Sequence, residues 1–325
     1  ASRLQARGRD VAVLTSTYGV DAPQAEAGIY RTLRLESNIH YYYGRQVLRY
    51  WADRRHNRWA VVDALSETAP DAVVVWGMWN LSRLIAAWLE ELAGPKMAYY
   101  VSDEWPAKPS AHRGYWDGTA PGRLGRLYKR VCRVPVRWLL RDEWAPPTLR
   151  LERVAVCSEA VRNLLVQSGV PVEHAKVIYH GIDPDPYRQA ALQRHTEAAP
   201  RTLRLVFVGT LAPHKGAHTA IEALGHLVRN GEGSGITLDV LGAGHPDYEA
   251  RLHQMVAEER LQDHVTFHRP IPRAELPAFL AQYDALVMPS IYEEPMARIS
   301  QEAMAAGLVL IATRTGGTRE ILVDG

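Results

Sequence analysis

The chain has 325 residues, more than one hydrophobic core usually serves, so we expect two domains. Its composition is that of an ordinary globular protein, with 47% hydrophobic and 23% charged residues, and a formal net charge of +2 gives no reason to expect nucleic acid as a partner. The longest apolar run, AVVVWGMWNL from Ala72, has the length of a strand and falls short of the roughly 20 residues that span a membrane.

The two cysteines, Cys132 and Cys157, form neither a CxxC motif nor a metal-ligand spacing, which favours reduced thiols in a cytoplasmic protein. No secretory signal is recognisable. The chain begins without Met in a helix-like stretch and stops shortly after a strand and a turn, so we expect it to be truncated at both ends.

Apolar, β-rich runs alternate with amphipathic helical stretches, a pattern that predicts parallel sheets with crossover helices. In the first part of the chain we expect strands at 11–16, 72–78, 96–101, 153–158 and 175–181, and helices near 45–66, 81–92, 122–141 and 159–168. In the second part we expect a helix after each of four strands and then a fifth strand, the strands being 203–209, 236–244, 264–268, 284–290 and 308–313.

The alternation is lost between these two parts, in a segment rich in Pro, Ala and polar residues. We therefore expect a Rossmann-like domain at 1–185, a linker at 186–202 and a second Rossmann-like domain at 203–325. Two doubly wound α/β domains of this kind would face each other across a cleft at the carboxyl ends of their strands, where open sheets bind ligands.

Two carboxylates in EEPMARISQEAMAAG stand eight residues apart, since 302 − 294 = 8. We expect Pro295 at the first position of a helix, because its missing N–H needs no partner there. Eight helical residues cover about 12 Å, close to the reach from a sugar hydroxyl past a diphosphate to a ribose. The free amides at the helix start would attract phosphate, and they belong to Met296, Ala297 and Arg298.

A simpler interpretation of these carboxylates stays open. Glu294 beside a helix start is favourable for the helix dipole alone, and Glu302 could pair with Arg298 four residues earlier.

Glycine-rich turns follow three other strands of the second half and converge on one edge of the predicted sheet. Lys215 and Gly216 open a helix there, so the ammonium could reach a diphosphate; an exposed Lys at a helix start is the alternative. The other turns contain Gly242 and Gly244, and Gly316 and Gly317, with ordinary tight turns as the alternative.

His214 and His218 stand four residues apart but lack a third ligand, so we expect no metal there.

The stretches VGTLAPHKG, LGAG and EEPMARISQEAMAAGLVLIATRTGGTREIL resemble the donor half of retaining glycosyltransferases of the GT-B type, in family 4 with its E-x7-E signature. CSEAVRNLLVQSGVP and VIYHGIDPDPYR resemble the end of that family's first domain. The resemblance covers most of the chain and is most specific in 203–325. It implies transfer of a hexose-like unit from a nucleotide diphosphate sugar to a hydroxyl acceptor, either a glycan, a lipid-linked molecule or a small molecule, without metal or other cofactor.

The resemblance also assigns roles residue by residue. Glu294 would hold hydroxyls of the transferred sugar, Glu302 the ribose of the nucleotide, and Lys215 would neutralise the diphosphate. The other donor-site residues that it implies are Gly209 and Thr210 in the first loop, Gly242, Gly244, His268 and Arg269 near the base, and Met296, Ala297, Arg298, Gly316 and Gly317 near the phosphates or sugar.

The sequence departs from the family pattern at several positions. Thr210 stands where the family often has an Arg, so it supplies only a hydroxyl, and Arg269 stands where a glycine is expected. Met296 and Ala297 replace the usual Phe-Gly. The family's first strand, with its glycine-rich turn, and its last crossover helix are not found in the sequence.

In the first half, SDEWP at 102–106 follows a predicted strand. Many relatives have a His-Asp pair near this point, so Asp103 is a candidate catalytic contact while Ser102 replaces the His. The alternative is that Asp103 caps a turn before Trp105. The DPD sequence at 183–185 matches a metal motif of another glycosyltransferase fold, but between prolines we interpret it as a turn.

Arginines recur at steps of three or four in GRLGRLYKRVCRVPVRWLLR, which places them on one stripe of a predicted helix that Pro135 would bend or split. Such a stripe can lie on an anionic membrane, so we expect a peripheral contact at the cytoplasmic face. A solvated face or a clasp for acidic residues is the alternative. The stripe comprises Arg123, Arg126, Arg130, Arg133, Arg137 and Arg141.

Three other functions stay open: a related GT-B enzyme such as a nucleotide-sugar epimerase, a Rossmann dehydrogenase, and a non-catalytic nucleotide-sugar-binding or scaffold protein. The sequence shows no GxGxxG after the opening strand of the second half, which disfavours the dehydrogenase there.

Overall fold

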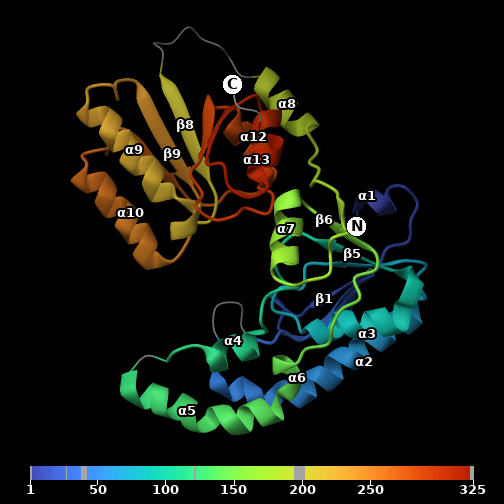
Figure 1. Cartoon of the computed structure of the whole chain (residues 1–325). Helices are drawn as coiled ribbons and strands as arrows, with labels where there is room; N and C mark the ends of the chain where they lie inside the picture. The colour runs from blue at the N-terminus through green and yellow to red at the C-terminus, as the bar shows by residue number, and fades with distance from the viewer. Residues whose placement is uncertain (1, 27, 38–41, 121, 194–201, 323–325) are drawn as a thin grey trace. The chain divides into compact units, whose positions relative to one another are not determined.

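The computed structural model describes residues 2–26, 28–37, 42–120, 122–193 and 202–322 (Figure 1). The chain divides into two compact units. Unit 1 comprises Ala1–Val156 and Arg162–Val177, and unit 2 comprises Cys157–Val161 and Ile178–Gly325.

The boundary between the units differs from the predicted one. It falls after Val177, so that the segment from Ile178 onward belongs to unit 2, whereas the sequence predicts a first domain that runs to 185. The predicted linker at 186–202 is also wrong in part, because α8 (Asp185–Leu192) is helical and buries Tyr187 in the core of unit 2. The rest of that linker, 194–201, lies outside the described residues.

The described strands of unit 1 form two sheets. In one, β1 (Val13–Ser16) pairs in parallel with β3 (Ile29–Leu33), which pairs antiparallel with β2 (Gln24–Glu26). The other is a parallel sheet in chain order, made of β4 (Val73–Trp76), β5 (Met97–Val101), β6 (Val154–Val156) and β7 (Lys176–Val177).

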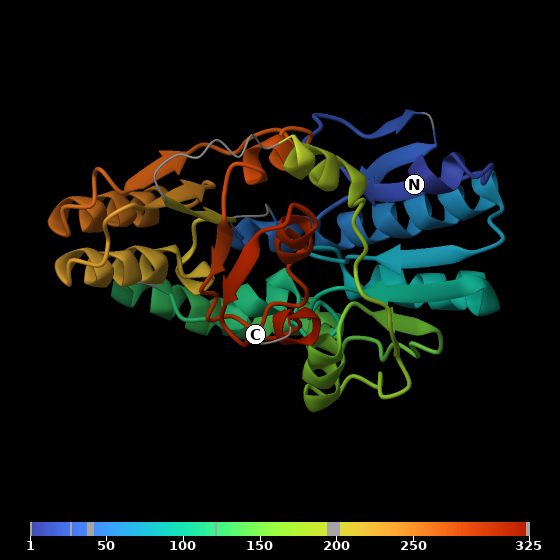
Figure 2. The same cartoon turned by 90° about the horizontal axis from the view of Figure 1, so that it is seen from above.

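Helices α2 and α3 lie side by side in unit 1, where Figures 1 and 2 draw them in blue and cyan. Ser82 starts α3 by accepting a hydrogen bond from the Leu84 amide, and Ser110 starts α4 by accepting one from Arg113. The helices of unit 1 are α1 (Ser2–Gln5), η1 (Gly44–Arg49), α2 (Tyr50–Thr68), α3 (Arg83–Ala93), η2 (Gly94–Lys96), α4 (Ala111–Asp117), α5 (Gly122–Leu139) and α6 (Arg141–Trp144). The next helix, α7 (Glu159–Gln167), begins in unit 2 and continues in unit 1 from Arg162.

Unit 2 contains one parallel five-stranded sheet in the order β10-β9-β8-β11-β12. From β8 the sheet grows through β9 to β10 on one side. The chain then returns to the other side of β8, where it adds β11 and β12, so the strand order reverses between β8 and β11. Ligands bind at such switch points of open α/β sheets. The strands are β8 (Leu203–Val208), β9 (Ile236–Leu241), β10 (Val265–His268), β11 (Ala285–Met288) and β12 (Val309–Ala312).

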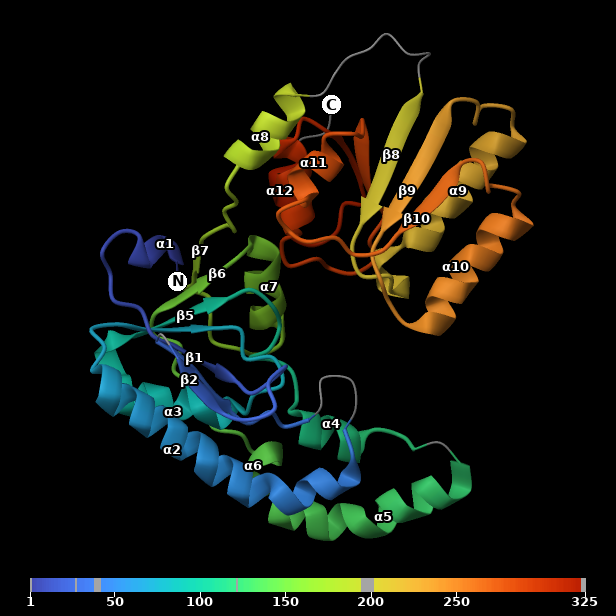
Figure 3. The ribbon, with the colours of Figure 1, turned by 180° about the vertical axis from the view of Figure 1, so that it is seen from behind.

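Alternate residues of these strands face two separate cores, as expected for a sheet covered on both faces. Phe207 packs with α9 and α10, whereas its neighbour Val206 packs with α8, α11 and α12. Figure 3 shows these two helical layers on either side of the sheet. The helices are α9 (Ala217–Arg229), α10 (Pro246–Glu258), α11 (Leu276–Leu280) and α12 (Arg298–Ala305), with η3 (Pro213–Lys215) and α13 (Thr318–Ile321) in the loops.

Candidate active site

A lysine and a buried glutamate meet at the switch point of unit 2. Lys215 follows β8 and Glu294 follows β11, and the lysine Nζ lies 2.5 Å from Glu294 Oε1. Ser290 donates to the same oxygen at 2.7 Å. Within the part of the chain that the structure describes, Glu294 Oε2 has no protein partner. One oxygen of this carboxylate is therefore held by the protein, while the other can accept a hydrogen bond from a ligand.

Gly216 allows the loop after β8 to approach the loop after β11. Its φ of +77° is left-handed, and a Cβ at this position would overlap the carbonyl oxygen of Pro289. Lys215 ends the short helix η3, and α9 begins only at Ala217. The prediction that Lys215 opens the long helix was therefore wrong by two residues, because Gly216 forms a turn between them.

A turn after β12 supports the Glu294 loop from the other side. The amide of Gly316 donates to Glu293 Oε2 at 2.6 Å, and the amide of Gly317 donates to the carbonyl of Glu294 at 2.7 Å. Side chains at either glycine would overlap the backbone at 293–295. The predicted glycines thus hold the glutamate loop in place.

The predicted start of α12 was wrong. The helix begins at Arg298, with extended Ala297 as its N-cap, and Pro295 lies before it. The Glu294 carbonyl, which would accept the first helical hydrogen bond, accepts from Gly317 instead. Glu294 and Glu302 therefore do not share one helix, and the 12 Å estimate does not apply.

Glu302 pairs with a residue that the sequence did not indicate. Arg273, in the loop after β10, donates to Glu302 Oε1 at 2.8 Å, so the predicted alternative partner Arg298 was wrong. Glu302 is buried, whereas the Arg273 side chain is 60% exposed. Helix α8 packs against α12, and burial, followed by the charge of Glu302, raises the pKa of Tyr187 on α8.

Gly242 and Gly244 bring the loop after β9 against the loop after β8. A Cβ at Gly242 would overlap the Gly209 carbonyl, and Gly244 forms a bridge with Leu211. The next residue of the first loop, Thr210, is exposed.

Of the residues predicted near the base, His268 contacts other side chains of the protein and Arg269 is exposed. The His268 Nε2 lies 2.7 Å from Asp239 Oδ2, and Tyr283 donates to the same oxygen at 2.6 Å. His268 therefore belongs to a hydrogen-bond network at the ends of β9 and β10.

In unit 1, the structure supports the turn interpretation of Asp103, because its Oδ1 accepts a hydrogen bond from the Trp105 amide at 2.8 Å. Among the described residues, no cluster of three or more His, Cys, Asp or Glu side chains could hold a metal ion. Nor does any described helix combine the length and apolar character that a membrane span requires.

The arginine stripe lies on α5, a single helix that contains Pro135 (Figure 1). Arg141 is not part of it, since α5 ends at Leu139 and Arg141 begins α6. Beside the arginines runs a second stripe at alternating steps of three and four, whose side chains are between 58% and 84% exposed. It comprises Leu124, Leu127, Val131, Val134 and Trp138.

Two family models together match nearly the whole chain. Residues 1–186 match the model described as Glycosyltransferase Family 4, and residues 189–325 match the one described as Glycosyl transferases group 1.

Similar curated proteins are longer than this chain. Glycogen synthase of Mycobacterium tuberculosis is 30% identical over 246 residues, covering 73% of this chain and 53% of that protein. D-inositol 3-phosphate glycosyltransferase of Pseudarthrobacter chlorophenolicus is 27% identical over 175 residues, covering 53% of this chain and 41% of that protein. The chain spans about half the length of the curated relatives it matches.

Solved structures share the fold. Sucrose-phosphate synthase from Thermosynechococcus elongatus gives a TM-score of 0.62 at 17% identity, covering 98% of this chain and 75% of that one. WaaG, a glycosyltransferase involved in lipopolysaccharide biosynthesis, gives a TM-score of 0.59 at 20% sequence identity, and the match covers 98% of this chain and 77% of that one. HepE from Anabaena in complex with UDP-glucose gives a TM-score of 0.58 at 21% sequence identity, and the match covers 82% of this chain and 66% of that one.

Proposed function

The chain belongs to glycosyltransferase family 4 and has the GT-B fold, and from this premise we propose that it transfers a sugar from a nucleotide diphosphate sugar to a hydroxyl acceptor. The observation that carries the proposal is the meeting of Lys215 with buried Glu294 at the switch point of unit 2. The solved HepE structure contains UDP-glucose, which supports a donor of this class.

In this proposal, Lys215 exchanges its partner Glu294 for the diphosphate when the donor binds. Without ligand, the ammonium is paired with Glu294. A bound diphosphate offers more negative charge than one carboxylate, so Lys215 turns to the diphosphate. Glu294 is then released to accept hydrogen bonds from hydroxyl groups of the sugar. Glu302, fixed by Arg273, holds the ribose.

The proposed reaction retains the anomeric configuration and needs no protein nucleophile. The bond between the anomeric carbon and the diphosphate oxygen breaks, a bond from the acceptor oxygen forms on the same face, and the acceptor proton moves to the departing diphosphate. Lys215 and the amides at the start of α12 stabilise the charge that develops on that oxygen. We propose that a cation of the protein serves this purpose and that no metal is required.

The proposal is tested with UDP-, GDP- and ADP-hexoses and an acceptor panel, by following nucleoside diphosphate release and reading the product's anomeric configuration by NMR. Release of one diphosphate, with a product of the donor's configuration, is expected, both with and without EDTA. Inverted product, or activity abolished by EDTA, would contradict the mechanism. Donor binding without release in the full-length protein would favour the scaffold function.

We also propose that α5 docks unit 1 onto anionic lipid at the cytoplasmic face of a membrane. Its apolar stripe is exposed along the whole helix, and five arginines lie one residue away on the adjacent stripe. Apolar side chains can enter the headgroup boundary while the arginines pair with phosphates, each contributing about 1 kcal/mol near the surface.

Vesicle flotation tests this contact, with phosphatidylcholine vesicles compared with vesicles that also contain phosphatidylglycerol. Arg130→Glu and Trp138→Ser are each expected to weaken binding to the anionic vesicles about tenfold. Arg251→Glu carries the same charge change at an exposed position of α10 in unit 2 and should leave binding unchanged. Equal loss in both arginine variants would show that net charge, and not α5, governs the binding.

A further inference from the structure

Among the described helices and strands, α7 alone has residues in both units. Its first residues lie within Cys157–Val161, which groups with unit 2, and the helix continues in unit 1 from Arg162. The strand before it, β6, belongs to unit 1. Whatever holds the start of α7 in unit 2 therefore acts on a helix that continues into unit 1.

A carboxylate from a distant part of the chain holds the start of α7. Glu320 Oε2 accepts from the Glu159 amide at 2.9 Å, and Glu320 Oε1 accepts from the Ala160 amide at 2.7 Å. The hydroxyl oxygen of Ser158 accepts from the Val161 amide at 3.1 Å. A helix start leaves four amides without a helical partner, and a carboxylate is favourable there because of the helix dipole. Glu320 therefore supplies two of the hydrogen bonds that cap α7.

The short turn that carries Glu320 also supports the loop of Glu294. The Glu320 amide donates to the Gly317 carbonyl at 3.1 Å, and the Gly317 amide donates to the Glu294 carbonyl at 2.7 Å. A Cβ added at Gly317 would lie 2.2 Å from the Pro295 carbonyl oxygen and 2.9 Å from Ser158 Cβ. Hydrogen bonds and direct packing thus join the Glu294 loop, this turn and the start of α7.

This junction is buried, so its parts cannot move independently. Ser158 is fully buried, and Thr318, beside Gly317, is 2% exposed. Close-packed groups of this kind transmit displacements to their neighbours. The Lys215–Glu294 pair lies at the other end of the same loop, so a ligand that draws Lys215 away changes the loop that Gly317 contacts.

We propose that Glu320 is a positioning residue that links the Glu294 loop to α7, so that a nucleotide bound in unit 2 strengthens the cap on α7. The proposal rests on the proposed transferase function, because the ligand is the nucleotide of the donor. Coupling between two sites is reciprocal, so loss of the cap weakens the nucleotide by a similar factor.

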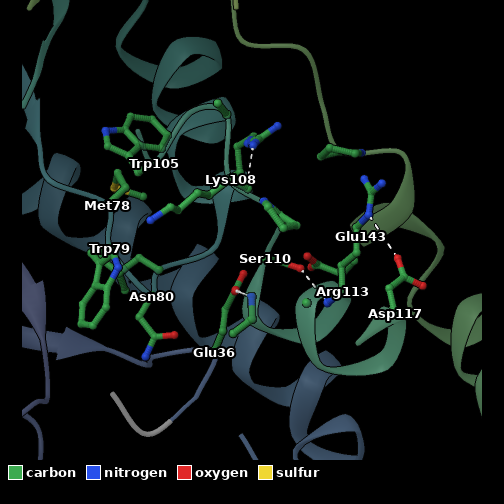
Figure 4. A pocket seen from close by; sticks show the side chains of 17 residues that line it. Glu36, Met78, Trp79, Asn80, Trp105, Lys108, Ser110, Arg113, Asp117 and Glu143 are labelled. Atoms are coloured by element: carbon green, nitrogen blue, oxygen red, sulfur yellow. Dashed lines mark hydrogen bonds and ion pairs between the residues drawn. The ribbon is translucent and has the colours of Figure 1, made fainter. Parts of the chain in front are cut away.

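The start of α4 in unit 1 provides a matched control. Glu36 Oε2 accepts from the Ala111 amide at 2.8 Å and the Ser110 hydroxyl oxygen from the Arg113 amide at 3.2 Å, so a remote carboxyl group and a serine cap α4 as they cap α7. Burial, followed by the charge of Glu143, raises the pKa of Glu36 to about 8. Figure 4 shows Glu36 and Ser110 in the wall of a cavity of about 520 Å³, whose lining residues all belong to unit 1.

Amide hydrogen exchange, resolved by NMR, tests the link with UDP, GDP and ADP as probes. The nucleotide that binds is expected to slow exchange of the Glu159 and Ala160 amides at least threefold and to leave exchange of the Ala111 amide unchanged. General stabilisation by a ligand would slow all three. This comparison uses the wild-type chain, so it does not depend on the folding of a variant.

Glu320→Gln tests the reciprocal effect. The variant keeps the size of the side chain but replaces one acceptor oxygen by an NH₂ group, so one amide of α7 loses its acceptor. Nucleotide affinity, measured by calorimetry, should fall at least threefold, and the nucleotide should no longer slow exchange at α7. Glu36→Gln makes the same replacement at α4 and should leave nucleotide affinity unchanged.

Equal slowing of exchange at the starts of α7 and α4, or unchanged nucleotide affinity in Glu320→Gln, would overturn the proposal, because Glu320 would then only stabilise α7. A wild-type chain that binds a nucleotide without any change at α7 loses this link and keeps the proposed donor site. A chain that binds none of the three nucleotides loses the donor site and, with it, the link.

Discussion

Glu294 and Glu302 are both buried carboxylates with a cation on one oxygen, but the two cations lie in different surroundings. Lys215 reaches Glu294 from the loop after β8, where we propose that the diphosphate binds, and Arg273 reaches Glu302 from the loop after β10. A ligand that draws Lys215 away changes Glu294 and leaves Glu302 paired. The two residues should therefore respond differently to substitution.

Glu294→Gln is expected to lower kcat/KM of sugar transfer by about 100-fold, or about 2.7 kcal/mol, because it removes a carboxylate that orients the sugar. Affinity for the nucleoside diphosphate should be unchanged or tighter, since Lys215 loses a competing partner. Steady-state kinetics and calorimetry measure the two effects. Glu232→Gln, in an exposed loop, is the control, and parallel loss of affinity and rate in Glu294→Gln would contradict the assigned role.

The raised pKa of Glu36 predicts a pH-dependent stability. The folded pKa is about 8, above the ordinary value of 4.5, so the stability associated with the protonated form is complete below about pH 4.5 and lost as the pH rises to about 8. The side chain in Glu36→Gln stays neutral at every pH. The Tm of this variant minus that of the wild type should therefore increase by about 5 °C between pH 5 and pH 8.5. Exposed Glu152→Gln should show no such trend, and a constant difference for Glu36→Gln would refute the shift.

The residues of the donor site were predictable only where they belong to local motifs. Lys215, Glu294 and Glu302 stand in recognisable stretches, and the structure pairs the first two, which the sequence did not predict. Arg273 and Ser290 were missed because nothing local marks them. Arg273 is 29 residues before Glu302, and only the tertiary fold of unit 2 brings the two together.

At the scale of elements, the alternation of apolar runs predicted the apolar strands well, but it missed two further strands and misplaced the start of a helix. Every strand expected from the sequence is present, and each lies within its predicted range. β2 and β3 were missed because β2 is short and exposed and carries no apolar run. The start of α12 was misplaced because a tertiary hydrogen bond from Gly317 overrides the local preference of Pro295.

Gly216→Ala tests how the loop after β8 is built. An alanine at this position would have a left-handed backbone, and its Cβ would also overlap the Pro289 carbonyl. Gly231 has a similar φ of +79° but open space around it. Gly231→Ala should lower Tm by about 2–4 °C, the effect of about 1 kcal/mol of backbone strain. Gly216→Ala should lower Tm at least twice as much and weaken nucleotide binding. Equal effects in calorimetric scans would mean that the two loops do not pack closely.

At the scale of the whole molecule, each unit contributes a different kind of site. Unit 2 offers buried carboxylates, a lysine and the start of α12 after the switch point, which suit a nucleotide diphosphate sugar. Unit 1 offers α5, an amphipathic helix with an exposed apolar stripe. The account as a whole depends on the proposed donor site, because the membrane contact takes its meaning from the proposed transferase function.

Calorimetric titration of the chain with UDP, GDP and ADP tests that site most directly, repeated on Glu302→Gln with Glu232→Gln as the control and with Tm recorded for each variant. One nucleotide should bind, and Glu302→Gln should weaken it more than tenfold, or about 1.4 kcal/mol, while the control matches the wild type. A folded wild-type chain that binds none of the three, or that binds one equally well without the Glu302 carboxylate, would contradict the assignment of unit 2 as the donor domain.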